Sequence, residues 1–335
     1  MLLSHGCLFN VYLTMTIPPV IVITGPTAGG KTALALALAD RFPCQLISVD
    51  SSLVYRQMNI GTAKPDVATL QQYPHALVDI RNIDQPYSAG EFVTDATAAI
   101  AAAIADQKIP VLVGGTLLYL RALFQGMAAM PAANPQIRLE LEAEAASSGW
   151  STLHDELTRI DPLAASRIAR SDRQRIQRAL EVYRLSGKPI TEWQRGTDTH
   201  SLQCPSLKLI LMPPERQVLH QKIARRSSEM IAAGLIGEVE KLRTGGISAE
   251  QLDQLPAMRA VGYRQVIDFL LGRIEQSELL ERITIATRQL AKRQLTWLRS
   301  DPGGAWFDPD AGSTISRASR LVAKATEGAC GKSDC

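Results

Sequence analysis

The sequence predicts an α/β protein with a doubly wound parallel sheet that is interrupted by a helical insertion. Short apolar runs of strand length alternate with segments of helical periodicity over most of the 335 residues. The first run, at residues 20–24, leads directly into a glycine-rich turn at 25–32 and then into a helical pattern. A stretch without strand signal, residues 131–204, separates the fourth apolar run from the fifth. These three observations give the fold class.

The composition sets limits on the function. The apolar share of 46% and the charged share of 21% are typical of a globular protein. The net charge of +3 is too small to indicate nucleic-acid binding by itself, so that inference depends on where the charges lie. Five scattered cysteines, an odd number, favour free thiols in a reducing compartment. We expect a cytoplasmic monomer without a membrane span, and a disordered extension at 1–17.

The glycine-rich turn after the first strand is the most specific motif. It reads GPTAGGKT and fits the pattern G-x-x-x-x-G-K-T between a strand and a helix at 33–39. Backbone amides of such a turn point at one anion, and the helix N-terminus adds partial positive charge. The fold is therefore P-loop NTPase-like, although a turn that binds nothing is the structural alternative. The predicted phosphate ligands are Gly25, Pro26, Thr27, Ala28, Gly29, Gly30, Lys31 and Thr32, with Thr32 also the predicted Mg²⁺ ligand.

The ends of the next strands should lie beside this turn. Predicted strands at 45–49, 76–80 and 110–113 all run parallel to the first, and ligands gather at the carboxyl edge of such sheets. Asp50 closes the second strand and could act as a general base or hold Mg²⁺ through water, unless it is an ordinary turn aspartate. Gly114, Gly115 and Thr116 close the fourth, where a Gly-Gly turn alone would also explain the pattern. The irregular segment 50–65 predicts a functional loop.

The rest of the chain is predicted to be mostly helical. Within the insertion, 131–204, helical patterns cover 136–146, 151–160 and 171–186, with prolines between them. A fifth strand at 207–212 is followed by helices at 214–233, 235–244 and 275–299. The P-loop core then comprises 18–130 and 205–310, and the Gly-, Ser- and Ala-rich end at 311–335 predicts a flexible tail.

Two basic runs indicate the kind of partner. Residues 167–178 hold five arginines against one aspartate, and residues 282–299 hold five basic residues and no acid. Spacings of three to five place several of these side chains on one helix face, which could follow a phosphate backbone. A solvated surface helix is the alternative, but such helices normally mix both signs of charge.

Taken together, these segments resemble the tRNA dimethylallyltransferase family, also called tRNA isopentenyltransferases. The similarity runs in family order over about residues 18–300. The matching segments are GPTAGGKT at 25–32, DSSLVYRQMNIGTAKP at 50–65, GGTLLYLRALFQG at 114–126, RQRIQRALEVYRLSGKPIT at 173–191, RAVGYRQ at 259–265 and ATRQLAKRQLTWLR at 286–299.

The resemblance implies an enzyme that transfers the dimethylallyl group of dimethylallyl diphosphate to N6 of the adenosine next to the anticodon. Diphosphate is released, and Mg²⁺ is the implied cofactor. Lys31 and Thr32 would bind the leaving diphosphate and the metal ion, Asp50 would be the general base, and Thr116 would contact the substrate. Implied contacts to the tRNA anticodon stem-loop are Asp50, Ser51, Ser52, Leu53, Thr116, Arg138, Gln174, Arg175, Ile176, Gln177, Arg178, Arg259, Gly262, Tyr263, Arg264, Lys292, Arg293, Gln294, Trp297 and Arg299.

This sequence departs from the family pattern at a few positions, and other functions compete. Leu53 stands where many relatives have glutamine, Asn59 where many have aspartate, and Gly29 where serine is usual, so side-chain contacts from position 53 are in doubt. The main alternative is an ATP-dependent P-loop kinase of a small metabolite, which would share Lys31 and Thr32. A second alternative is an RNA-binding protein with an inactive phosphate loop, and the intact Lys31, Thr32 and Asp50 argue against it. Prenylation of free adenylate would leave the insertion unexplained.

Overall fold

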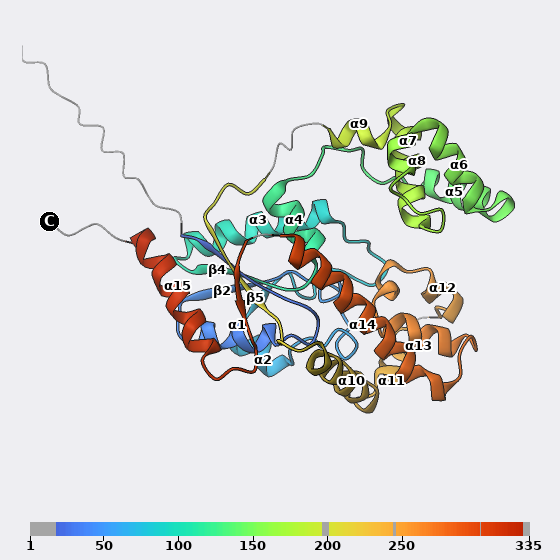
Figure 1. The fold of residues 1–335 in the computed structure, drawn as a ribbon. Coiled ribbons are helices and arrows are strands. Elements are labelled where there is room, and N and C mark those ends of the chain that lie inside the picture. Colours follow the sequence, from blue (N-terminus) through green and yellow to red (C-terminus); the bar gives the residue numbers. More distant parts are fainter. Residues whose placement is uncertain (1–17, 196–200, 244–245, 302, 331–335) are drawn as a thin grey trace, which may run out of the picture. The chain divides into compact units, whose positions relative to one another are not determined.

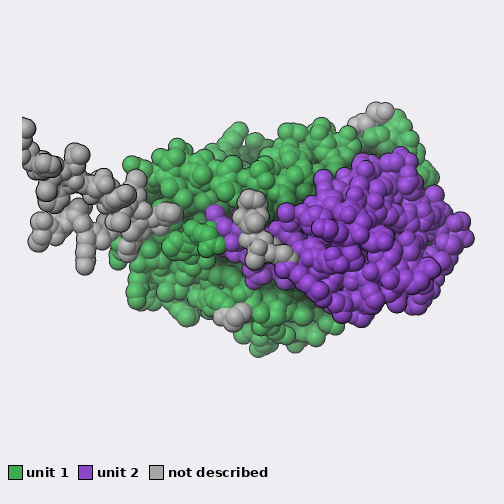
Figure 2. Space-filling view, turned by 90° about the horizontal axis from the view of Figure 1, so that it is seen from above, with its two compact units in different colours: residues 1–120, 203–335 green, residues 121–202 purple. Residues whose placement is uncertain are grey.

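The structure is a computed structural model that describes residues 18–195, 201–243, 246–301 and 303–330. The predicted extension at 1–17 lies outside the described residues. The chain forms two compact units, one of residues 1–120 and 203–335 and the other of residues 121–202 (Figure 2). In the described ranges no helix is long and apolar enough to cross a membrane.

Unit 1 is built on a parallel sheet, as the sequence predicts. In the described part of the chain the sheet has six strands in the order β3-β2-β4-β1-β5-β6, all parallel (Figure 1). All five residues of β1 are buried, which explains why this strand reads as a continuous apolar run. The strands are β1 Val20–Thr24, β2 Cys44–Ser48, β3 His75–Ala76, β4 Ile109–Val113, β5 Ser206–Leu211 and β6 Ala305–Phe307.

Helices of unit 1 cover the sheet and form a second hydrophobic core. Helices α1 and α15 share one cluster with the strands, while α3 packs against β2 and β4. Helices α11, α13 and α14 form the other cluster together with the segment 54–58. The helices are α1 Lys31–Ala39, α2 Val67–Gln72, α3 Ala89–Ala105, α4 Leu117–Gln125 (which runs on into unit 2), α10 Arg216–Ala232, α11 Leu235–Leu242, α12 Ala249–Asp253, the 3-10 turn η1 Pro256–Arg259, α13 Tyr263–Leu270, α14 Gln276–Ser300 and α15 Thr314–Cys330.

Unit 2 is helical and has a core of its own. Its described part contains α5 Pro135–Ser148, α6 Trp150–Ile160, α7 Pro162–Ala165, α8 Arg173–Ser186 and α9 Ile190–Gln194. Leu141, Leu157, Ile176 and Leu180 are buried together in one cluster. Asn134 and Asp161 cap the helices that begin with Pro135 and Pro162, so the prolines that punctuate the sequence mark helix starts.

The described part of the C-terminal segment differs from the flexible tail predicted at 311–335, of which residues 331–335 lie outside the described residues. Residues 314–330 form α15, and 305–307 add the edge strand β6 to the sheet. Ala318 and Val322, four residues apart, are buried against the core that contains Leu38 and Phe307. The small residues are therefore one face of an amphipathic helix, which composition alone did not reveal.

The predicted third strand is shorter than expected. Only His75 and Ala76 pair with β2. Leu77 and Asp79 then adopt positive φ angles of 64° and 56°, which are incompatible with extended backbone and end the strand.

Candidate active site

The glycine-rich loop joins β1 to α1 in a tightly confined path. Gly30, at the start of α1, has a left-handed backbone with φ of 80°, and Ala28 has φ of 59°. A Cβ atom on Gly25 would lie 2.3 Å from the carbonyl oxygen of Leu211, at the end of β5. Glycine is therefore required here because another strand passes against the loop.

Lys31 is the first residue of α1, and its side chain reaches back to the start of the loop. Its Nζ donates hydrogen bonds to the carbonyl oxygens of Gly25, at 3.1 Å, and Pro26, at 2.8 Å. Burial lowers the pKa of Lys31 to about 8, while the negative charge of Asp50 acts to raise it and the positive charge of Arg226 to lower it further. A partly buried ammonium whose partners in the described hydrogen bonds are two carbonyl oxygens is well suited to receive an anion.

Asp50 and Thr116 lie on the neighbouring strand ends, as predicted. The Thr116 amide donates to the carbonyl of Val49, and the Ser51 amide donates to Thr116 Oγ1 at 3.0 Å. Asp50 Oδ1 accepts a hydrogen bond of 2.8 Å from the Ser52 amide, which fixes the carboxylate in its turn. A Cβ atom on Gly114 would lie 2.0 Å from the Val49 carbonyl oxygen, so the Gly-Gly turn permits this close approach.

Gln294 of α14 connects the two glycine-containing loops. Its Oε1 accepts from the Thr27 amide at 2.8 Å, and its Nε2 donates to the Gly115 carbonyl at 2.9 Å. The residue is 9% exposed. We predicted Gln294 as a tRNA contact, but its amide is used within the protein to hold the phosphate loop against the Gly115 turn.

The structure adds one residue that the sequence analysis missed, Arg226 of α10. Burial lowers its pKa, and the negative charge of Asp50 acts in the opposite direction. The guanidinium also donates to the Thr62 carbonyl at 3.5 Å. The helical periodicity of α10 could have indicated that Arg226 is partly buried. Leu219, Ile223 and Ser227 are the buried residues of this helix, and Arg226 lies next to them on the helix surface.

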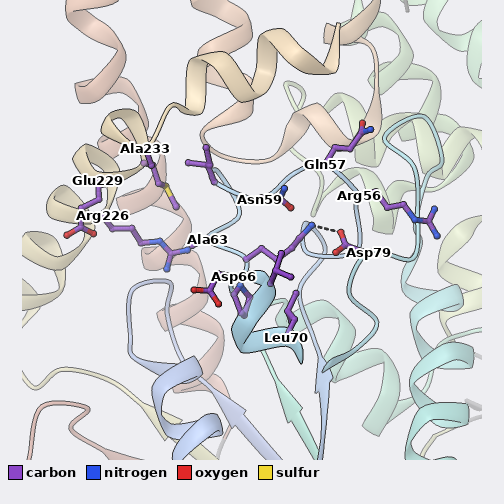
Figure 3. Close-up of a pocket in the computed structure, with 15 residues that line it drawn as sticks. Arg56, Gln57, Asn59, Ala63, Asp66, Leu70, Asp79, Arg226, Glu229 and Ala233 are labelled. Carbon is purple, nitrogen blue, oxygen red and sulfur yellow. Dashed lines mark hydrogen bonds and ion pairs between the residues drawn. The ribbon is translucent and has the colours of Figure 1, made fainter. Parts of the chain in front are cut away.

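The segment 50–65 forms an irregular loop, as predicted, and it borders a cavity. Lys64 Nζ donates to the Tyr55 carbonyl at 2.9 Å and to Asp79 Oδ1 at 2.5 Å, which closes the loop on itself. The cavity, of about 930 Å³, lies between this loop, α2 and α10 (Figure 3). Its lining combines apolar side chains, among them Ile60, Val67, Leu70 and Met230, with charged side chains of both signs, which are Arg56, Lys64, Arg226, Asp66, Asp79 and Glu229.

In unit 1 the predicted tRNA contacts divide into exposed and buried residues. Lys292, Arg293, Trp297 and Arg299 are exposed on α14, and Arg259 is exposed on η1. Among the other predicted contacts, Arg264 is paired with Asp253 and Asp268, at 3.3 and 3.6 Å. Tyr263 is fully buried and donates its hydroxyl to Glu238, so the prediction that its side chain contacts tRNA is wrong.

In unit 2 the predicted contacts surround α8. Arg138 and Arg178 both pair with the fully buried Glu181, at 2.8 and 2.7 Å, and their side chains remain partly exposed. Arg175 is 70% exposed and lies 3.4 Å from Asp172. Ile176 is fully buried in the core of the unit and cannot contact a ligand, contrary to the prediction. Gln174 is exposed, and Gln177 donates to Glu142.

The residues around the phosphate loop fit a divalent cation whose ligands come mostly from water and from a bound phosphate substrate. Across the described ranges there is no group of three or more His, Cys, Asp or Glu residues that could hold a metal ion. Mg²⁺ bound with a phosphate substrate needs only one or two protein oxygens, because phosphate and water complete its shell. The exposed Thr32 hydroxyl in the first turn of α1 and the Asp50 carboxylate are oxygen donors of this kind.

Comparison with known proteins identifies one family. The model of the IPP transferase family matches residues 53–301. A tRNA dimethylallyltransferase of Stenotrophomonas maltophilia is 52% identical over 294 residues, 87% of this chain and 93% of that protein. A tRNA dimethylallyltransferase 2 of Hahella chejuensis is 47% identical over 322 residues, 92% and 96% of the two chains.

Solved structures of the same family are similar in fold. The full-length tRNA isopentenylpyrophosphate transferase of Bacillus halodurans is 34% identical, with a TM-score of 0.65 over 93% of this chain and 98% of that one. A eukaryotic dimethylallyltransferase acting on tRNA, studied in crystallographic snapshots, is 25% identical, with a TM-score of 0.75 over 93% of this chain and 79% of that one.

Proposed function

The chain belongs to the IPP transferase family, and we propose that it is a tRNA dimethylallyltransferase that transfers the dimethylallyl group of dimethylallyl diphosphate to N6 of the adenosine beside the anticodon. The single observation that supports this most is a geometric one. Lys31, Asp50 and Thr116 meet at the ends of three adjacent strands, in a chain that matches the family over most of its length.

Asp50 is proposed as the general base. The exocyclic amine of adenine is a poor nucleophile, because its lone pair is delocalised into the ring. In the proposed step the N6–C bond forms as the C–O bond to diphosphate breaks. The proton of N6 passes to the Asp50 carboxylate, and the bonding electrons leave with diphosphate. Thr116, whose Oγ1 is held by the Ser51 amide, would contact the substrate next to this carboxylate.

The diphosphate would be bound by the phosphate loop. Negative charge develops on the leaving oxygen, and donors that are already in place stabilise it without reorganisation. The loop amides, Lys31 and Arg226 would supply these donors. Dimethylallyl diphosphate combines a short alkyl group with a strongly charged end. The cavity that Arg226 borders offers apolar side chains for the alkyl group, and Arg226 itself is a cation for the charged end.

Mg²⁺ is proposed as the cofactor of this step. It would be held by the Thr32 hydroxyl and, through water, by Asp50, and when bound it neutralises charge on the diphosphate.

We propose that exposed basic side chains bind the anticodon stem-loop. Lys292, Arg293 and Arg299 on α14 and Arg175 on α8 are available for phosphate contacts, and Trp297 is 38% exposed and could stack on a base. Removing the adenosine from the loop stack costs a few kcal/mol, and these contacts would offset that cost. We also propose that the enzyme is a cytoplasmic monomer.

A transfer assay tests the proposal directly. Purified protein is incubated with a divalent cation, radiolabelled dimethylallyl diphosphate and unmodified tRNA, without ATP. Label in tRNA that maps to the adenosine beside the anticodon is the expected result. Absence of label, together with ATP consumption when a mixture of small metabolites is supplied, would indicate the P-loop kinase instead.

A further inference from the structure

One carboxylate of unit 1 is bonded almost entirely to the backbone of the loop at residues 50–65. Glu238 of α11 accepts from the Asn59 amide at 2.9 Å, from the Ile60 amide at 2.8 and 3.1 Å, and from the Gly61 amide at 3.3 Å. The Tyr263 hydroxyl donates to the same carboxylate at 2.5 Å. Both carboxylate oxygens are therefore engaged by three successive amides and one phenol.

Such an arrangement fixes a turn that has no regular structure of its own. The amides of residues 59–61 are not part of a helix or strand ladder, and a buried amide without a partner is costly. Hydrogen bonds to a charged acceptor are stronger than those to a neutral one. Glycine is needed at position 61, because a Cβ atom there would lie 2.4 Å from the Tyr263 ring.

Glu238 itself is rigidly placed. Its neighbours Leu235 and Val239 on α11 and Tyr263 on α13 are fully buried in one hydrophobic cluster. The turn is thus bonded to a helix of the buried cluster, at a point far from the turn in the sequence.

The turn held by Glu238 forms one wall of the cavity described above. Asn59, Ile60, Ala63 and Lys64 line it on the side of the loop, and Met230 and Arg226 line it from α10 (Figure 3). Arg226 also donates to the Thr62 carbonyl, so the same few residues are bonded to α10 and to α11. A shift of the turn would change the cavity without touching the phosphate loop.

We propose that Glu238 is a positioning residue that holds the turn at 59–61 in place, so that the cavity accepts the organic part of the small substrate. The inference rests on the proposed function, because it takes dimethylallyl diphosphate as that substrate. Glu238 acts through the backbone it binds and does not contact the reacting atoms.

The test compares binding of dimethylallyl diphosphate with binding of inorganic diphosphate. In Glu238→Gln the amide keeps one acceptor oxygen but turns an NH₂ group toward amides that need an acceptor. We expect Kd and KM for dimethylallyl diphosphate to rise about tenfold to a hundredfold. Kd for inorganic diphosphate should stay within about twofold of wild type, since Glu238 bonds to the turn at 59–61 and to Tyr263 and not to the proposed diphosphate donors, which are the loop amides, Lys31 and Arg226. The KM for tRNA should also stay within about twofold.

Matched variants separate positioning from a general loss of structure. Glu240→Gln changes an exposed glutamate two residues away on the same helix and should leave both ligands unaffected. Tyr263→Phe keeps the buried ring and removes the hydroxyl, so it should cause a smaller rise for dimethylallyl diphosphate alone. Glu238→Asp keeps the charge and should recover part of the affinity.

Each other outcome overturns the inference. Equal weakening of both ligands in Glu238→Gln and in Tyr263→Phe would assign Glu238 a general structural role. Wild-type binding in Glu238→Gln would mean that the turn holds its place without the carboxylate. If wild-type protein binds inorganic diphosphate but transfers no label from dimethylallyl diphosphate to tRNA, the proposed function fails instead, and the two failures are distinct.

Discussion

At the scale of single residues, the site is defined by an excess of positive charge. The negative charge of Asp50 acts to raise the pKa of both Lys31 and Arg226, so this carboxylate lies near two partly buried cations. A partly desolvated site with a net positive charge attracts a diphosphate, and it stabilises the charge that develops when diphosphate leaves. In the proposed reaction, binding of the leaving group and activation of the nucleophile would thus occur in one small volume.

Replacement of Asp50 by asparagine tests the general base. The side chain keeps nearly the same shape but no longer takes up a proton, so we expect kcat to fall about a hundredfold or more. The Kd for tRNA should stay near the wild-type value. Single-turnover transfer and filter binding measure the two quantities. Asp84→Asn, at an exposed turn, is the control, and turnover near the wild-type rate in Asp50→Asn would remove the assignment.

The lowered pKa of Lys31 predicts proton uptake on ligand binding. In the free protein burial lowers this pKa from 10.5 to about 8, and a bound diphosphate should raise it again. The bound state then holds more protons between these values, so affinity should fall as pH rises above about 8. Titration calorimetry at about pH 9 in buffers of different ionisation enthalpy should show uptake of close to one proton. Lys31→Met corrects for ionisation of the ligand, and equal uptake by both proteins would exclude Lys31.

Residues of the site could be predicted where a motif is contiguous in the chain. Lys31, Asp50 and Thr116 follow strands whose apolar runs are visible in the sequence, so their meeting point follows from the rules of parallel sheets. The roles of Gln294 and Arg226 depend on contacts across more than 160 residues, from helices whose packing is set by the whole core. No local pattern encodes such a contact.

At the scale of elements, the periodicity of helices carried more information than composition. The long basic helix was predicted at 275–299 and runs from Gln276 to Ser300, because its apolar residues repeat at helical spacing. Helix α15 differs from the predicted tail, because a composition rich in glycine, serine and alanine indicates flexibility while the spacing of Ala318 and Val322 indicates one buried face of a helix. The third strand was overestimated, since positive φ at Leu77 and Asp79 is not visible in an apolar run.

The exposed face of α14 is predicted to bind the phosphate backbone of tRNA. Lys292→Ala with Arg293→Ala should weaken tRNA binding. The double change should reduce the slope of log Kd against log salt concentration by roughly one for each phosphate group that these two side chains neutralise. Fluorescence anisotropy over a range of salt concentrations measures this slope. The control is Arg320→Ala with Lys324→Ala, two exposed basic residues on α15. An unchanged slope in the α14 variant would mean that this face does not meet tRNA.

At the scale of the whole molecule, the basic residues proposed to contact tRNA are distributed over two units that each have their own core. Unit 2 buries its own apolar cluster, and its basic residues lie on α8 and the helices packed around it. Unit 1 holds the phosphate loop and α14. The net charge of +3 conceals this division, because the two runs hold ten of the 36 basic residues but only one of the 33 acids.

A double-mutant cycle tests whether both units contact the same tRNA molecule. Arg175→Ala in unit 2 and Arg293→Ala in unit 1 each remove one exposed cation, and each should raise the Kd for tRNA about two- to fivefold. The side chains belong to different units and share no partner in the described contacts, so their free-energy changes should add to within about 0.5 kcal/mol. Filter binding at one fixed salt concentration gives the four constants. Arg159→Ala, which changes an exposed residue at the end of α6, is the matched control within unit 2.

If Arg175→Ala behaves like this control while Arg293→Ala weakens binding, unit 1 alone holds the tRNA. A double variant no weaker than the poorer single variant would mean that the two cations serve alternative binding modes, because the two free-energy changes add only when both cations bind the tRNA at the same time.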